Sequence, residues 1–261
     1  MKLPLYQVDA FTDTLFAGNP AAVCPLDTWL PDTTLQAIAG ENNLSETAFY
    51  VSTGREFPIR WFTPTAEVDL CGHATLAAAH VILNHSGHPS KTVLFTSKSG
   101  PLSVVGDNDY LVMDFPAQRP EECTIPAELV AALGREPLEL FSSADYMAVF
   151  DDEDAILSIQ PEIELLKKLD LRGVIITAPG RTTDFVSRFF APKFGINEDP
   201  VTGSAHCLLA PYWSERFGKR SLTGRQLSQR GGEVVCETGG DRVSLAGKAV
   251  TYLEGTITIN V

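Results

Sequence analysis

The chain has 261 residues and a formal net charge of −13 at pH 7. Nucleic-acid-binding proteins concentrate positive charge on one surface, so this balance excludes nucleic acid as an expected partner. No apolar run approaches 18 residues and no secretory signal pattern is visible, so neither a membrane-spanning helix nor export is predicted. The five cysteines are odd in number and scattered, which is typical of a reduced, cytoplasmic protein.

In the first half of the chain, runs that alternate apolar and polar residues, or that are rich in β-branched and aromatic residues, predict strands. These strands are residues 4–11, a short strand after a turn at 18–20, 45–53, 57–64, and a hairpin that turns near 106–109. Asp32 is a candidate N-cap for a helix over 33–42. The alanine-rich segment 73–85 predicts a second, buried helix.

The second half opens with a predicted helix over 125–134, which Gly134 would end. The remaining predictions are strands over 145–150, 154–160, 173–179 and 185–192 and an amphipathic helix over 161–169. A long apolar helix is predicted over 202–218, where Pro211 should kink or shorten it. The proline-rich stretch 115–120 predicts two domains, residues 1–116 and 117–261, with the last strand left open to pack back on the first half.

The two halves repeat one motif. RWFTP at 60–64 and RFFAP at 188–192 agree at an offset of 128, and a glycine-led segment follows each, GHAT at 72–75 and GSAH at 203–206. A duplicated strand–loop–helix–strand unit implies two similar halves. Each strongly apolar helix can be buried all round only if a curved sheet wraps it. We therefore expect two such units whose matching loops face a central cleft.

Glu46 is the first candidate for chemistry. It lies in NLSETAFY, a segment that otherwise has the pattern of a buried strand. Partial burial would raise the pKa of this carboxyl toward the working pH of a general base. The alternative is an ordinary exposed strand residue, since alternation gives every strand a polar face.

The segment DLCGHAT (69–75) is the second candidate. Gly72 permits a tight turn, after which His73 and Ala74 supply free backbone N–H groups at a helix start. That geometry binds anions such as a substrate carboxylate, and His73 could also move a proton. A histidine that only caps the helix is the alternative.

The segment NEDPVTGSAH (197–206) is the repeat partner of that loop. Asp199 and Ser204 are plausible caps for a helix that begins near Gly203. Because the loops match, two helix N-termini would point into one cleft and stabilise an anionic substrate or an enolate-like intermediate. Asn19, in GNPAAV, is either a turn residue or a loop amide that contacts substrate.

Three other kinds of site lack support. His73 and His80 are seven residues apart, but no carboxylate or thiolate completes a ligand set and HExxH is absent, so no metal is expected. The serine-hydrolase pattern GxSxG and the dinucleotide pattern GxGxxG are also absent.

Four strings together resemble the phenazine-biosynthesis PhzF-like proteins, whose fold is shared with diaminopimelate epimerase. They are VDAFTDTLFAGNPAAV, NLSETAF, FTPTAEVDLCGHAT and EDPVTGSAH, in family order over most of the chain. The resemblance implies an α+β fold of two pseudo-symmetric halves, each a barrel-like, mostly antiparallel sheet wrapped around a central helix. It also implies no cofactor, a homodimer, and Glu46 as the acid/base with His73, Asp199 and Ser204 lining the site.

The wider superfamily includes racemases and epimerases that use two cysteines, one from each half. Cys71 occupies the first thiol position, but Thr202 stands at the second and Cys207 lies four residues too far along. A threonine hydroxyl is far too weak an acid for that role, so two-thiol racemisation is not expected. Cys71 is interpreted as a small buried residue.

These observations predict a cofactor-independent isomerase that moves a proton on a small anionic, carboxylate-bearing metabolite. Glu46 would be the general acid/base, in a cleft between the halves, and backbone N–H groups near Gly72 and Gly203 would bind the substrate. Two alternatives stay open: a racemase or epimerase that uses Cys71, and a non-catalytic ligand-binding member of the fold. The substrate cannot be identified from these patterns.

Overall fold

The structure is a computed structural model that describes residues 1–259, so the last two residues of the predicted C-terminal half lie outside it. The chain divides into two compact units. Unit 1 is Met1–Asp114 together with the segment that starts at Ala246, and unit 2 is Phe115–Leu245. Both units combine strands with helices, which confirms the mixed class that the sequence predicts.

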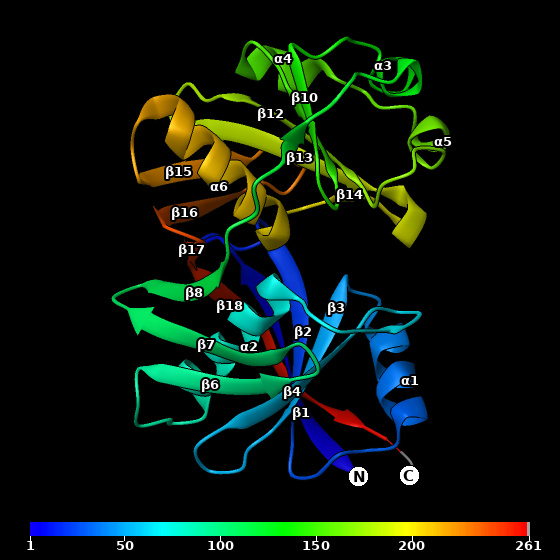
Figure 1. Ribbon diagram of the computed structural model, residues 1–261. Helices are drawn as coiled ribbons and strands as arrows, with labels where there is room; N and C mark the ends of the chain where they lie inside the picture. Colours follow the sequence, from blue (N-terminus) through cyan, green and yellow to red (C-terminus); the bar gives the residue numbers. More distant parts are fainter. Residues whose placement is uncertain (260–261) are drawn as a thin grey trace. The chain divides into compact units, whose positions relative to one another are not determined.

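Unit 1 has a sheet and two helices (Figure 1). Its strands are β1 (Lys2–Ala10), β2 (Asn19–Leu26), β3 (Glu46–Val51), β4 (Phe57–Phe62), β5 (Glu67–Val68), β6 (Thr92–Ser97), β7 (Gly100–Asp107), β8 (Tyr110–Pro116) and β18 (Ala249–Thr258). Its helices are α1 (Asp32–Asn42) and α2 (Gly72–His85).

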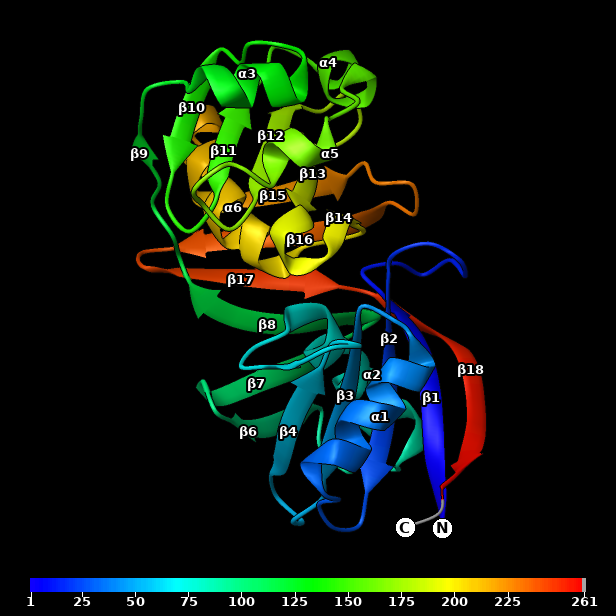
Figure 2. The same ribbon diagram turned by 90° about the vertical axis from the view of Figure 1, so that its right-hand side faces the viewer.

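Most neighbouring strands of unit 1 are antiparallel, but β2 runs parallel to β3 and β4 runs parallel to β6. The last strand, β18, lies along β1 in antiparallel register (Figure 2). Helix α2 packs against β1, β2, β3, β6 and β7, and its residues 73–79 are all buried. Since this helix carries four alanines, three of them consecutive, the strands can approach it closely from several sides. The sheet of unit 1 therefore curves around α2.

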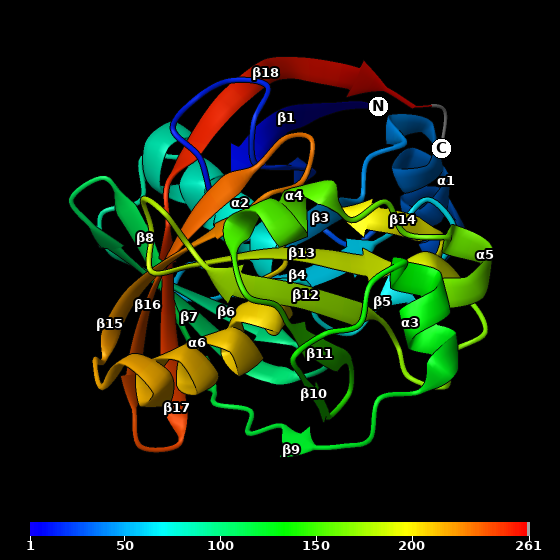
Figure 3. The ribbon, with the colours of Figure 1, turned by 90° about the horizontal axis from the view of Figure 1, so that it is seen from above.

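Unit 2 has its own strands and helices. The strands are β9 (Glu121–Glu122), β10 (Glu139–Ser142), β11 (Tyr146–Val149), β12 (Val174–Pro179), β13 (Phe185–Ala191), β14 (Ile196–Asp199), β15 (Ser221–Gln226), β16 (Gly232–Gly239) and β17 (Arg242–Gly247). The helices are α3 (Ala127–Leu133), α4 (Glu153–Ser158), α5 (Ile163–Leu166), the 3-10 turn η1 (Pro192–Phe194) and α6 (Gly203–Phe217). Figure 3 shows the short helices α3 and α5, which pack on each other.

The order of strand pairings along the chain is the same in the two units. In unit 1 the parallel pair β2–β3 is followed by antiparallel β3–β4, parallel β4–β6 and antiparallel β6–β7. In unit 2 the same series is β11–β12, β12–β13, β13–β15 and β15–β16. The apolar helix, α2 or α6, precedes the third pairing in each case. Pseudo-symmetry of the two halves in space stays a prediction.

The predicted strand over 154–160 is wrong, because α4 forms there instead. The side chain of Asp152 accepts a hydrogen bond from the backbone N–H of Ala155, which satisfies a free donor of the first turn. Glu153 and Asp154 then lie in that turn, where negative charge is stabilised by the helix dipole. The apolar residues that follow, which suggested a strand, therefore form a helix because its first turn is stabilised.

Pro211 neither ends nor shortens α6, which runs from Gly203 to Phe217. Proline has no N–H, so the carbonyl of Cys207, four residues earlier, loses its helical donor. That carbonyl accepts the backbone N–H of Gln118 at 2.9 Å instead. The prediction of a shortened helix fails because a second segment supplies the missing donor.

Within residues 1–259, every helix falls short of the length and apolar character needed to cross a bilayer.

Candidate active site

Glu46 is the first residue of β3 and only 8% of it is exposed. In the parallel pair β2–β3 it lies opposite Ala21, so Asn19, two residues before Ala21, is on the same face of the sheet. Asn19 is fully buried. Gly18 before it has φ +66°, and a Cβ there would meet the Ala10 carbonyl oxygen at 2.2 Å. The turn that places Asn19 beside this end of the sheet therefore requires glycine.

His73, in the first turn of α2, contacts Glu46. Its Nε2 lies 3.1 Å from Glu46 Oε2, and both side chains are about nine-tenths buried. Neither of these two atoms makes an aligned hydrogen bond with a described residue. Their contact is therefore an ion pair. Buried polar atoms in this condition are uncommon in native proteins, and each of them calls for an explanation.

The charges of this pair follow from its surroundings. Burial alone would raise the pKa of Glu46, but the charge of His73 and the close polar contacts with His73 and Cys71 outweigh it and hold the pKa below its ordinary value, so the expected rise is wrong. Burial opposes the charged form of His73, yet Cys71 and Glu46 raise its pKa well above the usual range. At neutral pH we therefore assign a carboxylate to Glu46 and an imidazolium to His73.

Cys71, the N-cap residue of α2, completes the cluster. Its Sγ lies 3.5 Å from His73 Nδ1. Glu46, Cys71 and His73 offer ligand-type atoms within 4.8 Å of one another, the pattern of a small metal site. A metal ion binds one ring nitrogen of a histidine, however, and here the sulfur faces Nδ1 while the carboxylate faces Nε2. The structure thus brings a carboxylate and a thiol to His73, which was not expected from the sequence, and the shortest contacts run through both ring nitrogens.

The start of α2 supplies main-chain donors beside this cluster. The first helical hydrogen bond joins the N–H of Thr75 to the Cys71 carbonyl at 3.1 Å. The backbone N–H groups of Gly72 and His73 precede it and point out of the helix end, as in any first turn, while the N–H of Ala74 faces the Cys71 side chain. Together with the helix dipole they suit a substrate carboxylate.

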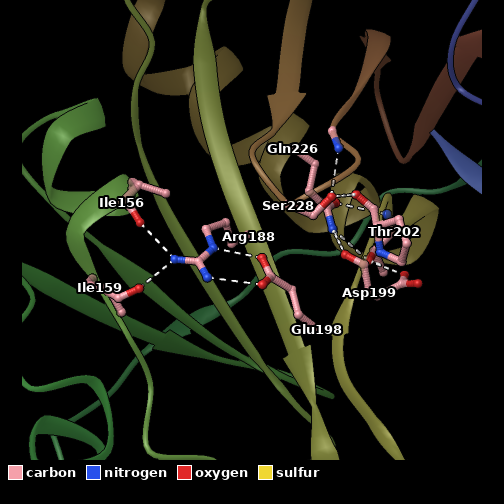
Figure 4. A network of polar contacts seen from close by, with 10 residues as sticks. Ile156, Ile159, Arg188, Glu198, Asp199, Thr202, Gln226 and Ser228 are labelled. Atoms are coloured by element: carbon pink, nitrogen blue, oxygen red, sulfur yellow. Dashed lines mark hydrogen bonds and ion pairs between the residues drawn. The ribbon is translucent and has the colours of Figure 1, made fainter. Parts of the chain in front are cut away.

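In unit 2, a network of hydrogen bonds holds Asp199 and the start of α6 (Figure 4). Thr202 Oγ1 donates to Asp199 Oδ2 at 2.5 Å. The side chain of Gln226, fully buried at the end of β15, donates to the Asp199 carbonyl and to Thr202 Oγ1 and accepts the Thr202 N–H. Ser228 donates to the carbonyl of Pro200 at 2.8 Å. The loop before α6 is thus fixed at several main-chain atoms.

Ser204, in the first turn of α6, accepts a hydrogen bond from Arg172 Nη2 at 3.1 Å. Arg172 in turn makes a two-pronged ion pair with the buried carboxylate of Asp145. The hydrogen bonds to Asp145, and further the charges of Asp145 and Asp199, raise the pKa of Arg172. The guanidinium of Arg172, itself paired with Asp145, therefore lies next to the helix start and fixes the Ser204 hydroxyl.

His206, one turn into α6, behaves in the opposite way to His73. Its Nδ1 lies 2.8 Å from the Thr202 carbonyl, and a carbonyl can only accept, so Nδ1 carries the proton. Burial lowers the pKa of this ring to about 4. His206 is thus neutral at pH 7 and serves the structure of the helix start.

The repeated arginines hold the strands beneath these loops. Arg60 on β4 pairs with both carboxylate oxygens of Glu67, and Arg188 on β13 does the same with Glu198 (Figure 4). Arg188 also donates to two carbonyls of the α4 region, at 3.1 Å and 2.6 Å. In each unit, the arginine of the repeated motif therefore links its strand to the neighbouring strand.

The predicted site residues fall into two groups by unit. Unit 1 holds Asn19, Glu46, Gly72, His73 and Ala74 at the starts of β2, β3 and α2, and unit 2 holds Asp199, Gly203 and Ser204 around the start of α6. A cleft that combines the two groups stays a prediction.

Sequence reasoning missed Gln226, Arg172 and the contact of Cys71 with His73. Gln226 is the last residue of β15 and Arg172 precedes β12, and no local pattern marks either of them. For Cys71 a signal was present, since it stands two residues before His73 at a helix start.

Comparisons with known proteins agree with this structure. A family model described as phenazine biosynthesis-like protein, PhzC-PhzF, matches residues 8–255. An uncharacterized isomerase of Pseudomonas aeruginosa is 52% identical over 98% of this chain and 99% of its own length. Phenazine biosynthesis-like domain-containing protein 2 of mouse is 41% identical over 99% of this chain and 100% of its own.

Among solved structures, a PhzF-family phenazine biosynthesis protein of Enterococcus faecalis superimposes with a TM-score of 0.97 and 48% sequence identity. The match covers 99% of this chain and 100% of the other. The similarity therefore extends over both units.

Proposed function

The chain is an isomerase that belongs to the phenazine biosynthesis-like (PhzC-PhzF) family, and we propose that it moves a proton between two carbons of a small, carboxylate-bearing metabolite. The observation that carries the proposal is the buried carboxylate of Glu46, 3.1 Å from the ring of His73. A carboxylate held ionised in a buried place is ready to accept a proton from carbon.

In the proposed reaction Glu46 removes a proton from a carbon of the substrate, and the C–H electron pair moves into a system conjugated with the substrate carboxylate. Glu46, which can exchange the proton with water while it carries it, then delivers a proton to another carbon, so that one double bond changes place and the atom count is unchanged. The imidazolium of His73 compensates the anion that forms in between. Protein residues alone supply these steps.

The substrate carboxylate would bind the free N–H groups at the start of α2. Asp199 and Ser204 are assigned to the substrate from unit 2, Asp199 toward an amine or hydroxyl and Ser204 toward an anionic group. Arg172, which donates to Ser204, holds that hydroxyl in place. Asn19, on the face of the sheet that carries Glu46, is a further polar contact.

A racemase that uses Cys71 is less well supported. Burial and the charge of Glu46 raise the pKa of the Cys71 thiol, which disfavours the thiolate that such chemistry needs. The second thiol position holds Thr202, whose hydroxyl already donates to Asp199. Neither position offers a ready thiolate base.

Solvent exchange tests the proposal. The full chain would be incubated in D₂O with a panel of small unsaturated carboxylates, and deuterium in each compound would be followed by NMR and mass spectrometry. Glu46→Gln should fold normally and abolish the exchange that the wild type catalyses, a loss of at least about 100-fold. Glu56→Gln, in the exposed loop before β4, is the matched control and should exchange normally. Exchange retained by Glu46→Gln would overturn the assignment.

A further inference from the structure

The main chain of Cys71 is fixed at the start of α2. Its carbonyl accepts both the N–H of Thr75, at 3.1 Å, and the Thr75 hydroxyl, at 2.6 Å. Its backbone is extended, with φ −144° and ψ 111°, and only 7% of the residue is exposed. The position from which the side chain starts is therefore fixed, and the sulfur lies 3.5 Å from His73 Nδ1.

Cys24 shows what a cysteine used only for packing looks like in this unit. It is fully buried on β2, within an apolar cluster that includes Leu35 and Phe49. Burial, the single cause, raises the pKa of its thiol to about 12. Cys71 differs because an imidazole and a carboxylate both act on it. Packing alone explains the burial of Cys24. It does not explain why Cys71 lies beside an imidazole and a carboxylate.

A buried imidazolium needs an acceptor for each of its two N–H groups, because an unmatched charged donor is costly away from water. Glu46 lies at Nε2 of His73. Within the described part of unit 1, Cys71 is the group within hydrogen-bond distance of Nδ1. Glu46 and Cys71 are also the titratable groups that act on this ring.

We propose that Cys71 is a positioning residue for the isomerase reaction: its sulfur accepts the Nδ1–H of His73, which fixes the ring so that the Nε2–H faces Glu46. This inference rests on the proposed function, since the Glu46–His73 pair is its object. It gives Cys71 a role different from that of a thiol base, because the sulfur bonds to no substrate atom. It goes further than the interpretation of Cys71 as a small buried residue, which its 7% exposure supports.

Proton titration of the full chain, with no substrate present, tests this inference. The chain is labelled with ¹⁵N-histidine, and the signals of His73 are identified as those that disappear in His73→Gln. In Cys71→Ala the protonation constant of His73 should fall by about tenfold, since one of its two acceptors is gone. Cys71→Ser, which keeps an acceptor atom, should recover most of the wild-type constant.

Cys24→Ala is the matched control, because it removes a buried thiol of the same unit without touching His73, and it should leave the constant unchanged. If Cys71→Ala does not fold, Cys71→Val fills the space without an acceptor and carries the same expectation. A His73 constant that changes less than twofold in the variant lacking an acceptor would overturn the inference. Since no substrate is involved, this result and the exchange result for Glu46→Gln can fail independently.

Discussion

The starts of α2 and α6 share a main-chain design. Each helix begins at a glycine after an N-cap residue in extended conformation, Cys71 with φ −144° and ψ 111° and Thr202 with φ −116° and ψ 101°. In each, the carbonyl of that N-cap residue contacts the side chain four residues later, Thr75 Oγ1 at 2.6 Å or His206 Nδ1 at 2.8 Å. The duplication has therefore kept the same backbone geometry at the two helix starts.

The side chains at the two starts have diverged. Beside α2 a carboxylate and an imidazolium face each other with buried atoms that lack aligned hydrogen bonds. Beside α6 the corresponding loop is tied by Gln226, which bonds to Asp199 and Thr202 through both ends of its amide. One start thus holds a buried carboxylate–imidazole pair, and the other is a fixed framework. A two-base racemase would need proton-moving groups at both.

The largest effect is expected from Gln226→Leu, which removes the amide that holds the loop before α6. It leaves the Thr202 N–H and the Asp199 carbonyl buried without their amide partner, so the free energy of unfolding should fall by about 3 kcal/mol or more. Chemical denaturation measures it. Gln36→Leu, which removes a single half-buried bond to the Thr63 carbonyl, is the control and should cost about 1 kcal/mol. Equal losses in the two variants would contradict the fixed framework.

His206 should make the stability of the protein fall in acid. Its folded pKa of about 4 lies below the unfolded value near 6.5, so the unfolded state binds the proton first as the pH drops. The loss begins near pH 6.5 and reaches about 3 kcal/mol near pH 4. Unfolding free energies of His206→Gln and wild type, measured between pH 7 and 4, should diverge in slope. Parallel slopes would show that His206 is not held neutral.

His73 should have the opposite sign. Because its folded pKa is raised, its stabilising contribution is complete below its unfolded pKa, near 6.5, and is lost as the pH rises through the folded value. Glu46, with a lowered pKa, contributes above its unfolded value and loses that contribution in acid. Denaturation of His73→Gln above pH 7 should lack the decline seen in wild type. A decline of the same size in the variant would assign it to other groups.

The smallest effect is expected from Thr202→Cys, which restores a thiol at the second position. The change in unfolding free energy should be about 1 kcal/mol, from the loss of the hydroxyl's bond to Asp199. The adjacent carboxylate should keep the new thiol protonated, so alkylation by iodoacetamide should be slow at pH 7. Fast alkylation would mean that the start of α6 can stabilise a thiolate. That result would contradict the proposed difference between the starts of α2 and α6.

Much of the fold follows from local patterns. The strand at 4–11, the helix at 33–42 and the hairpin near 106–109 form as β1, α1 and the β7–β8 turn. Gly134 ends α3 with φ +68°, as its position after the helix suggests. The resemblance to the PhzF-like family, read from four strings, is confirmed over residues 8–255. These features depend on neighbours close in sequence, or on motifs long enough to be specific.

The parts that could not be predicted depend on distant partners. Gln226 lies 24 residues from Thr202, and Arg172 lies 32 residues from Ser204, so neither contact has a local signature. The homodimer, the cytoplasmic location and the cleft between the halves remain predictions. A resemblance names residue types at a site, but the hydrogen bonds that set their charge come only from the folded chain.

The proline in α6 has a consequence for how the segment 115–120 can vary. The Cys207 carbonyl has no helical donor because of Pro211. It accepts the main-chain N–H of Gln118, and the Gln118 side chain takes no part in this bond. Any residue except proline offers that N–H. The hydrogen bond between this segment and the helix therefore does not depend on which side chain stands at position 118. Substitutions at position 118 should be tolerated freely in related chains, while proline at 118 and alanine at 211 should each loosen the same bond from opposite ends.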